Sequence, residues 1–140
     1  MRKYIYAIAL VAMLGSCTLE TSDNGNLDGL WQLRSLDSLA NGSSVDMHAN
    51  GVYWAVQLDL LEARDRQVRV LFRFNHTGDS LVLSNPYVNL RDSSDIKVNE
   101  SAMLAPLGIN SLEEHFAVKA LSSGSMVLES PALRLHFRKY

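Results

Sequence analysis

Apolar and polar side chains alternate with a period of two along much of the chain, which predicts β-strands with one buried face. The runs with this pattern, each expected to form a strand, are residues 29–36, 52–60, 67–74, 81–83, 116–120, 126–128 and 133–137. Residues 95–98 could supply an eighth strand. Turn residues such as Ser, Gly and Pro separate most of the runs, so we expect neighbouring strands to pair in antiparallel hairpins.

Two of these hairpins have a predicted register. A turn centred on Arg64 would place Leu58 opposite Val70, Val56 opposite Phe72 and Trp54 opposite Phe74. The same register would pair Asp59 with Arg69 on the outer face. A two-residue loop at Thr77-Gly78 would set Phe74 against Leu81 and Phe72 against Leu83.

Seven or eight antiparallel strands within one domain predict an all-β fold, an up-and-down barrel of about eight strands, with a β-sandwich as the alternative. The weak part of this pattern is residues 85–112, where the apolar stretch 102–109 does not alternate and Pro106 disfavours regular structure. We expect either a loop packed over the end of the core or a lid over an opening, with a short helical turn starting near Asn99.

The chain begins with Arg2, Lys3 and about a dozen apolar or aromatic residues, the layout of a signal peptide over residues 1–16. The four residues at the end of this segment, Leu14-Gly15-Ser16-Cys17, resemble the lipobox of bacterial lipoproteins. That resemblance implies that Cys17 carries a diacylglyceryl group and becomes an acylated N-terminus, with acyl chains such as palmitate. Cys17 is the only cysteine, so no disulfide within the chain competes with this interpretation.

The mature protein would therefore consist of a polar, lipidated tether (17–28) and one domain (29–140). Thr18 follows the cysteine where Asp would retain an enterobacterial lipoprotein at the inner membrane, so we expect an outer-membrane anchor. Glu20 and Asp23 resemble a short version of the acidic export signal of some Bacteroidetes surface lipoproteins, which leaves open whether the protein faces the periplasm or the cell surface.

Removing Arg2 and Lys3 from 13 basic residues leaves 11 against 15 acidic residues, a net charge of about −4 for the mature chain. This charge excludes an electrostatic nucleic-acid binder.

The first predicted strand opens with Gly29-Leu30-Trp31, which is similar to the Gly-x-Trp of lipocalins. In that family the tryptophan closes the barrel floor beneath an Arg or Lys that follows the last strand; here the cation would be Arg138 or Lys139. The family's Thr-Asp-Tyr element is missing. With the lipobox, the whole pattern resembles small lipocalin-like lipoproteins of Bacteroidetes, although Trp31 would also suit the core of any β fold.

Catalytic and metal-binding motifs find little support. The four histidines, His48, His76, His115 and His136, lack metal-ligand spacing, so we expect no metal site and no cofactor. Asp46 and His48 lie in a loop rich in Gly, Ser and Asn. Glu113-Glu114-His115 fits a turn better than a site, because neighbouring strand side chains face opposite ways. The arginines at 64, 66, 69 and 73 are offset by nearby acids and predict a mixed outer face.

Two non-enzymatic functions fit the sequence best, and an enzyme is a third hypothesis. The first is a membrane-anchored barrel that binds a small apolar or amphipathic ligand beneath a lid near residues 103–109. Its lining would include Trp31, Trp54, Phe72, Phe74, Phe116 and Met103. The second is a packed barrel that serves protein interaction or scaffolding in the envelope, because these bulky side chains could fill the interior themselves. The sequence leaves the oligomeric state open.

Overall fold

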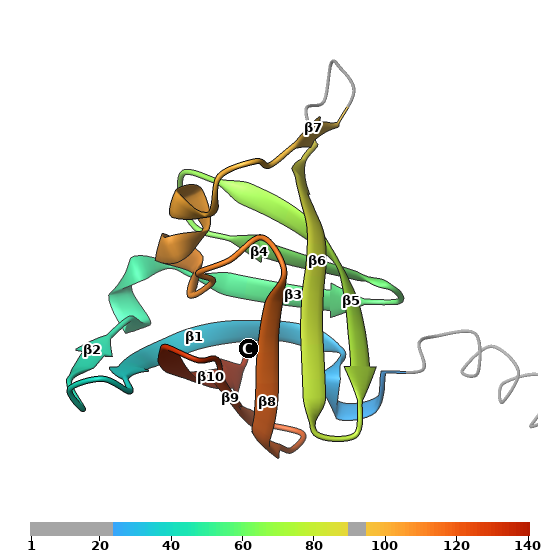
Figure 1. Cartoon of the computed structure of the whole chain (residues 1–140). Helices are drawn as coiled ribbons and strands as arrows, with labels where there is room; N and C mark the ends of the chain where they lie inside the picture. Colours follow the sequence, from blue (N-terminus) through green and yellow to red (C-terminus); the bar gives the residue numbers. More distant parts are fainter. Residues whose placement is uncertain (1–23, 90–94) are drawn as a thin grey trace, which may run out of the picture.

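The computed structural model describes residues 24–89 and 95–140. Eight antiparallel strands form a closed barrel in the order β1-β3-β4-β5-β6-β8-β9-β10 (Figure 1). The barrel strands are β1 (Gly29–Ser38), β3 (Tyr53–Gln57), β4 (Leu60–Arg64), β5 (Arg69–Thr77), β6 (Ser80–Val88), β8 (Glu114–Leu121), β9 (Ser125–Glu129) and β10 (Leu133–Lys139). The predicted all-β, up-and-down barrel is confirmed.

Pairing between the first and last strands closes the barrel. β1 and β10 are antiparallel, with Trp31 opposite Lys139 at one end and Ser38 opposite Leu133 at the other. A β-sandwich would leave these two strands in separate sheets, so the alternative fold is wrong. The register shifts between Leu33 and Ser35, a bulge that locally bends β1.

The predicted hairpin centred on Arg64 is wrong, because the chain turns earlier. Gln57 pairs with Leu60 across a two-residue turn in which Leu58 has a φ of 55°. Residues 60–64 then form β4, a strand in its own right, which pairs with β5 through Ala63 and Val70. The inward positions change from even to odd numbers across this turn, so Leu58 continues the apolar pattern but lies exposed.

The β5–β6 hairpin exists, but its register differs from the prediction by two residues. Thr77 pairs with Ser80, so the loop is Gly78-Asp79 and Phe74 lies opposite Leu83 instead of Leu81. Gly78 has a φ of 56°, which glycine adopts without strain. A shift of two residues keeps the same side chains on the inner face, so the predicted core survives the error.

Short elements surround the barrel. They are η1 (Gly25–Leu27), β2 (Ser44–Asp46), η2 (His48–Asn50), β7 (Ile96–Lys97) and η3 (Ser101–Leu107). β7 pairs only with β6 and lies outside the barrel, so the eighth barrel strand is β4 and not the predicted 95–98. Figure 1 places η1 and η3 on opposite sides of the barrel. Among the described residues, no helix has the length and apolar character needed to cross a bilayer.

The barrel interior and the outer polar clusters

The barrel interior is filled with its own apolar side chains. Trp54 packs among them, with its ring centroid 4.7 Å from that of Phe137 and 5.7 Å from that of Phe116. Trp54, Phe72 and Leu81 have no exposed area, so no void large enough for water adjoins them. Apolar side chains of the chain itself therefore occupy the interior around these residues.

The six residues predicted to line a ligand site fall into two groups. Trp31, Trp54, Phe72 and Phe116 are buried in one cluster, and Phe74 is partly buried against it. Met103 points outward, with 38% of its surface exposed. The structure thus brings five of the six to the interior, while their role in holding a ligand stays a prediction.

One end of the barrel is closed around Trp31. Its indole Nε1 donates to the carbonyl oxygen of Leu27 in η1 at 2.8 Å, and Lys139 Nζ lies 4.8 Å from the ring centroid. Lys139 Nζ also donates to the Asn26 carbonyl oxygen at 3.1 Å. Gly29 has a φ of 127°, and a Cβ there would lie 3.1 Å from Lys139 Cε, so glycine makes room for the lysine stem. Of the two cations expected at this place, Lys139 occupies it.

A plug from the β7–β8 connection closes the other side of the core. Leu104 and Leu107 in η3, together with Ile109, are completely buried. The Leu107 carbonyl oxygen accepts a 3.0 Å hydrogen bond from Trp54 Nε1. Gly108, with a φ of 88°, ends η3, and a Cβ there would meet Leu135 Cδ2 at 2.8 Å. Residues 101–109 thus form a loop packed over the core, the first of the two expectations for this segment.

Comparison with known proteins agrees with this geometry. Residues 12–140 match the lipocalin-like domain family, which is most of the chain. The chain belongs to that family. A solved structure of a lipocalin-like protein from Bacteroides uniformis superposes with a TM-score of 0.64, covering 83% of this chain and 100% of that one at 24% identity. An uncharacterized protein from Bacteroides eggerthii gives 0.59, covering 81% and 98% at 19% identity.

Both structural likenesses concern the fold alone. A comparison with curated proteins finds no match. Family membership and these relatives establish a lipocalin-like barrel. In some proteins with this fold the interior is large enough to hold one small ligand. In this member the described interior is occupied by side chains.

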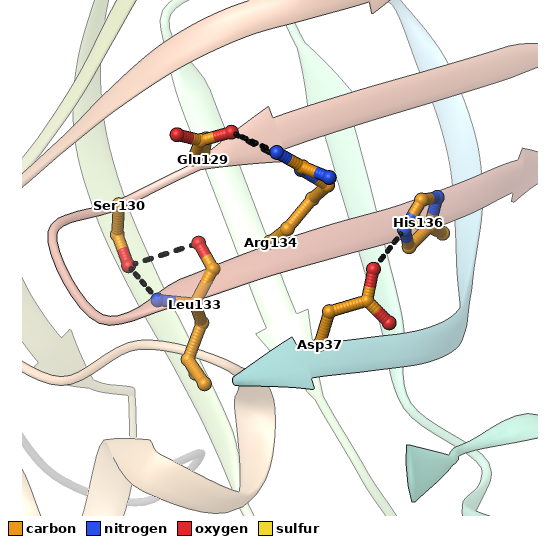
Figure 2. Close-up of polar contacts among 6 residues, drawn as sticks. All are labelled: Asp37, Glu129, Ser130, Leu133, Arg134 and His136. Carbon is orange, nitrogen blue, oxygen red and sulfur yellow. Dashed lines mark hydrogen bonds and ion pairs between the residues drawn. The ribbon is translucent and has the colours of Figure 1, made fainter. Parts of the chain in front are cut away.

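The outer face of the lipocalin-like barrel carries a polar cluster across β1, β2 and β10. His136 Nε2 lies 2.7 Å from Asp37 Oδ2, as Figure 2 shows, and Ser44 Oγ donates to Asp37 Oδ1 at 2.7 Å. The Ser44 hydroxyl, followed by His136, lowers the pKa of Asp37 below its usual value. Because the carboxylate lies between the hydroxyl and the imidazole, this order does not let His136 deprotonate Ser44, as a hydrolase triad requires.

The hydrogen bonds near β8 are structural. Glu114 is 5% exposed, and its Oε2 accepts from the Asn110 backbone N–H at 2.7 Å. His115 faces outward and lies 3.3 Å from Glu113 Oε2. Glu114 and His115 therefore do not converge, as expected of neighbours on a strand.

The remaining histidines show no shared site. Asp46 Oδ1 accepts from the backbone N–H of His48 at 2.9 Å, a turn contact and not a carboxylate–imidazole pair. His76 Nε2 is buried with no hydrogen-bond partner within residues 24–89 and 95–140. Across that same part of the chain, no group of three His, Cys, Asp or Glu side chains is placed to hold a metal ion.

Two parts of this architecture were missed by sequence reasoning. The first is the identity of the plug residues: a loop packed over the core was one of the two expectations for this segment, but the sequence did not single out Leu104, Leu107 and Ile109. These residues are spaced by three and then by two positions, which matches neither a strand nor a regular helix. The apolar stretch 102–109 that contains them is evident in the sequence. The second is the Ser44–Asp37 contact, which depends on β2 folding back onto β1. No local signal in a polar loop predicts that pairing.

Proposed function

We propose that the protein is a non-enzymatic, lipid-anchored module of the bacterial cell envelope that meets its partners with the outer surface of a packed barrel. The filled interior is the observation that carries this proposal. Side chains of the buried cluster, among them Trp54 and Phe72, have no exposed area. A barrel of eight strands has room for either one small ligand or its own side chains. Because side chains occupy the interior here, we expect binding to take place on the outer surface.

The lipid anchor rests on the lipobox resemblance at Leu14–Cys17, which lies outside the described residues. A mature chain with three acyl groups would stay on a bilayer, because each buried methylene contributes about 0.8 kcal/mol. We place the anchor in the outer membrane and leave its side open. Cys17→Ser expressed from the full gene should move the protein from the membrane fraction to the soluble fraction. Wild-type protein with an intact leader and no added acyl mass would contradict the anchor.

The packed barrel is tested on the full chain extracted from its own host in a nonionic detergent. Native mass spectrometry should find the lipidated chain without a stoichiometric small molecule. Cross-linking in living cells before extraction should give discrete adducts with envelope proteins. A chain that forms no adduct, or that carries one apolar molecule per copy, would contradict the packed-barrel proposal.

Ligand binding inside the barrel is the second candidate, and the position of the η3 plug favours it. Leu104, Leu107 and Ile109 belong to a connection and not to a barrel strand, so they can leave without breaking the ladder of strands. Removing each from the core costs about 1.5–3 kcal/mol, which an apolar ligand in the same space would have to offset. In this case a co-purified ligand should speed hydrogen exchange of the backbone amides of residues 104, 105 and 107–109, whereas the packed barrel predicts no such change.

The non-enzymatic role is supported by the arrangement of the polar clusters described above. Asp37 separates Ser44 from His136. Glu114 is occupied by the Asn110 backbone. An interaction module needs neither a nucleophile nor a general base, and the described clusters serve turns and strand pairing instead.

A further inference from the structure

A hollow on the outer face lies between the start of β3 and the β4–β5 turn. Its volume is about 430 Å³. The residues around it are Gly51, Tyr53, Arg64, Asp65, Arg66 and Arg69. Three of the six are arginines, so the hollow is cationic in a chain whose overall charge is negative.

The acids near this hollow do not neutralise all three arginines. Asp65 Oδ1 accepts from the backbone N–H groups of Gln67 and Val68, each at 2.8 Å, and so holds the turn. Glu62 lies outside the hollow and shares one oxygen between Arg64 at 3.6 Å and Arg69 at 3.3 Å. A single carboxylate therefore faces two guanidinium groups.

Arg66 has no carboxylate partner within the described part of the chain. Its Nη2 donates to the Ala49 carbonyl oxygen at 3.4 Å. Gly51, with a φ of 69°, lies against the side chain, and a Cβ there would be 3.3 Å from Arg66 Nε. The Arg66 guanidinium is thus held at the rim of the hollow while its charge is unpaired.

The ring of Tyr53, which lines the hollow, positions a second arginine, Arg64. The Arg64 guanidinium carbon lies 5.9 Å from the centroid of the Tyr53 ring, and the Tyr53 and Tyr140 rings pack edge to face with their centroids 5.6 Å apart. A guanidinium fixed over a ring loses little side-chain entropy when it binds an anion. Arg64 and Arg66 therefore both line this one hollow.

We propose that this hollow binds an oxyanion, the phosphate or carboxylate group of a small soluble ligand. A planar guanidinium donates two parallel hydrogen bonds to such a group, which suits the unpaired Arg66, while Arg64 and Arg69 add charge. In Figure 1 the β4–β5 turn and η1 lie on opposite sides of the barrel. This site goes beyond the proposed function and does not depend on whether the interior opens.

Calorimetric titration of the full chain in nonionic detergent tests the site, with inorganic phosphate and citrate as probes at ionic strength held constant with chloride. We expect saturable binding of at least one probe, and the stronger one identifies the preferred group. Arg66→Gln should weaken it by about tenfold or more, because the variant lacks the charge and the two parallel hydrogen bonds of the guanidinium. Arg66→Lys should retain part of the affinity.

Arg134→Gln is the matched control, because Arg134 is paired with Glu129 at 3.0 Å on another part of the surface. It should leave the affinity unchanged. Amide spectra of Arg66→Gln that match wild type away from residues 49–69 establish that the variant is folded; if they do not, Arg69→Gln replaces it. Failure of both probes to saturate, or equal weakening by Arg134→Gln, would overturn the proposal.

Discussion

Lys139 and Trp31 face each other across the seam of the barrel, paired in register between β10 and β1 with Lys139 Nζ 4.8 Å from the centroid of the Trp31 ring. The two residues are separated by nearly the whole domain in sequence. Their contact joins the chain's last strand to its first, and η1 lies against both through the Leu27 and Asn26 carbonyl oxygens. The Gly-x-Trp pattern therefore has a physical basis. Gly29 leaves room for the aliphatic part of the Lys139 side chain, and the ring of Trp31 lies against its ammonium group.

Loss of the Lys139 charge should weaken the seam. Lys139→Met keeps most of the apolar stem but removes the cation–π contact and the hydrogen bond to Asn26, so we expect a loss of about 1 kcal/mol in the free energy of unfolding. Urea titration measures it. Lys119→Met, at an exposed position on β8, is the control and should change stability by less than about 0.5 kcal/mol. Equal effects of the two substitutions would show that the Trp31 contact contributes nothing.

Gly29→Ala should destabilise the same seam by a different route. The φ of 127° is strained for any residue with a Cβ, and that Cβ would press on Lys139 Cε at 3.1 Å. We expect a loss of about 1–3 kcal/mol in the free energy of unfolding.

Gly124→Ala is a matched control for Gly29→Ala, because its backbone is not in the positive-φ region and its Cβ would meet nothing within 4 Å. Urea unfolding should therefore distinguish the two alanine variants. If Gly124→Ala cost as much as Gly29→Ala, the conformation and crowding at Gly29 would not be the cause.

Sequence periodicity predicted the barrel and most of its inward residues, because alternation reports directly which face of a strand is buried. The alternation misled at two positions. Leu58 continues the apolar pattern of β3, but it lies in a turn after which the inward positions change from even to odd numbers. Ala63 points inward, but its small side chain stands between the polar Glu62 and Arg64, so the pattern did not mark it as buried. The register predicted for the hairpin centred on Arg64 was wrong for the same reason. Two-residue turns fix register, and Leu58-Asp59 carries none of the glycine or asparagine usual in such a turn.

The candidate site was less predictable than the barrel. Trp31, Trp54, Phe72 and Phe116 could be assigned to the interior from alternation. Whether that interior is hollow depends on a tertiary feature, the insertion of residues 104–109, and no strand pattern contains that information. The Arg66 hollow depends likewise on Gly51 from one connection meeting the turn of another.

The Asp37–His136 contact predicts a dependence of stability on pH. Hydrogen bonds from Ser44 and His136 lower the pKa of Asp37, so the folded state favours the charged carboxylate more than the unfolded chain does. The resulting stabilisation is complete above the unfolded pKa of about 3.9 and is lost as pH falls through the lower folded pKa. Asp37→Asn should therefore be less stable than wild type at pH 6, with the difference shrinking toward pH 3.

Unfolding free energies from urea titration at several pH values test this dependence. Asp79→Asn, in the β5–β6 turn, is the control because the Asp79 carboxylate has no hydrogen-bond or ion-pair partner within residues 24–89 and 95–140. Its difference from wild type should stay nearly constant with pH. A gap between wild type and Asp37→Asn that stayed equally wide at pH 3 would mean that ionisation of Asp37 is not what stabilises the β1–β10 contact.

The plug is tested by a pair of substitutions in η3. Leu107 is fully buried beneath Trp54, whereas Met103 in the same short helix is 38% exposed. Leu107→Ala should cost about 2–5 kcal/mol, the range for a large-to-small change that leaves a cavity, and Met103→Ala less than about 0.5 kcal/mol. Thermal or urea unfolding measures both. Because a displaced plug would bury neither residue, similar small effects of the two variants would mean that η3 lies off the core in solution, which would favour an open barrel able to take up an apolar ligand.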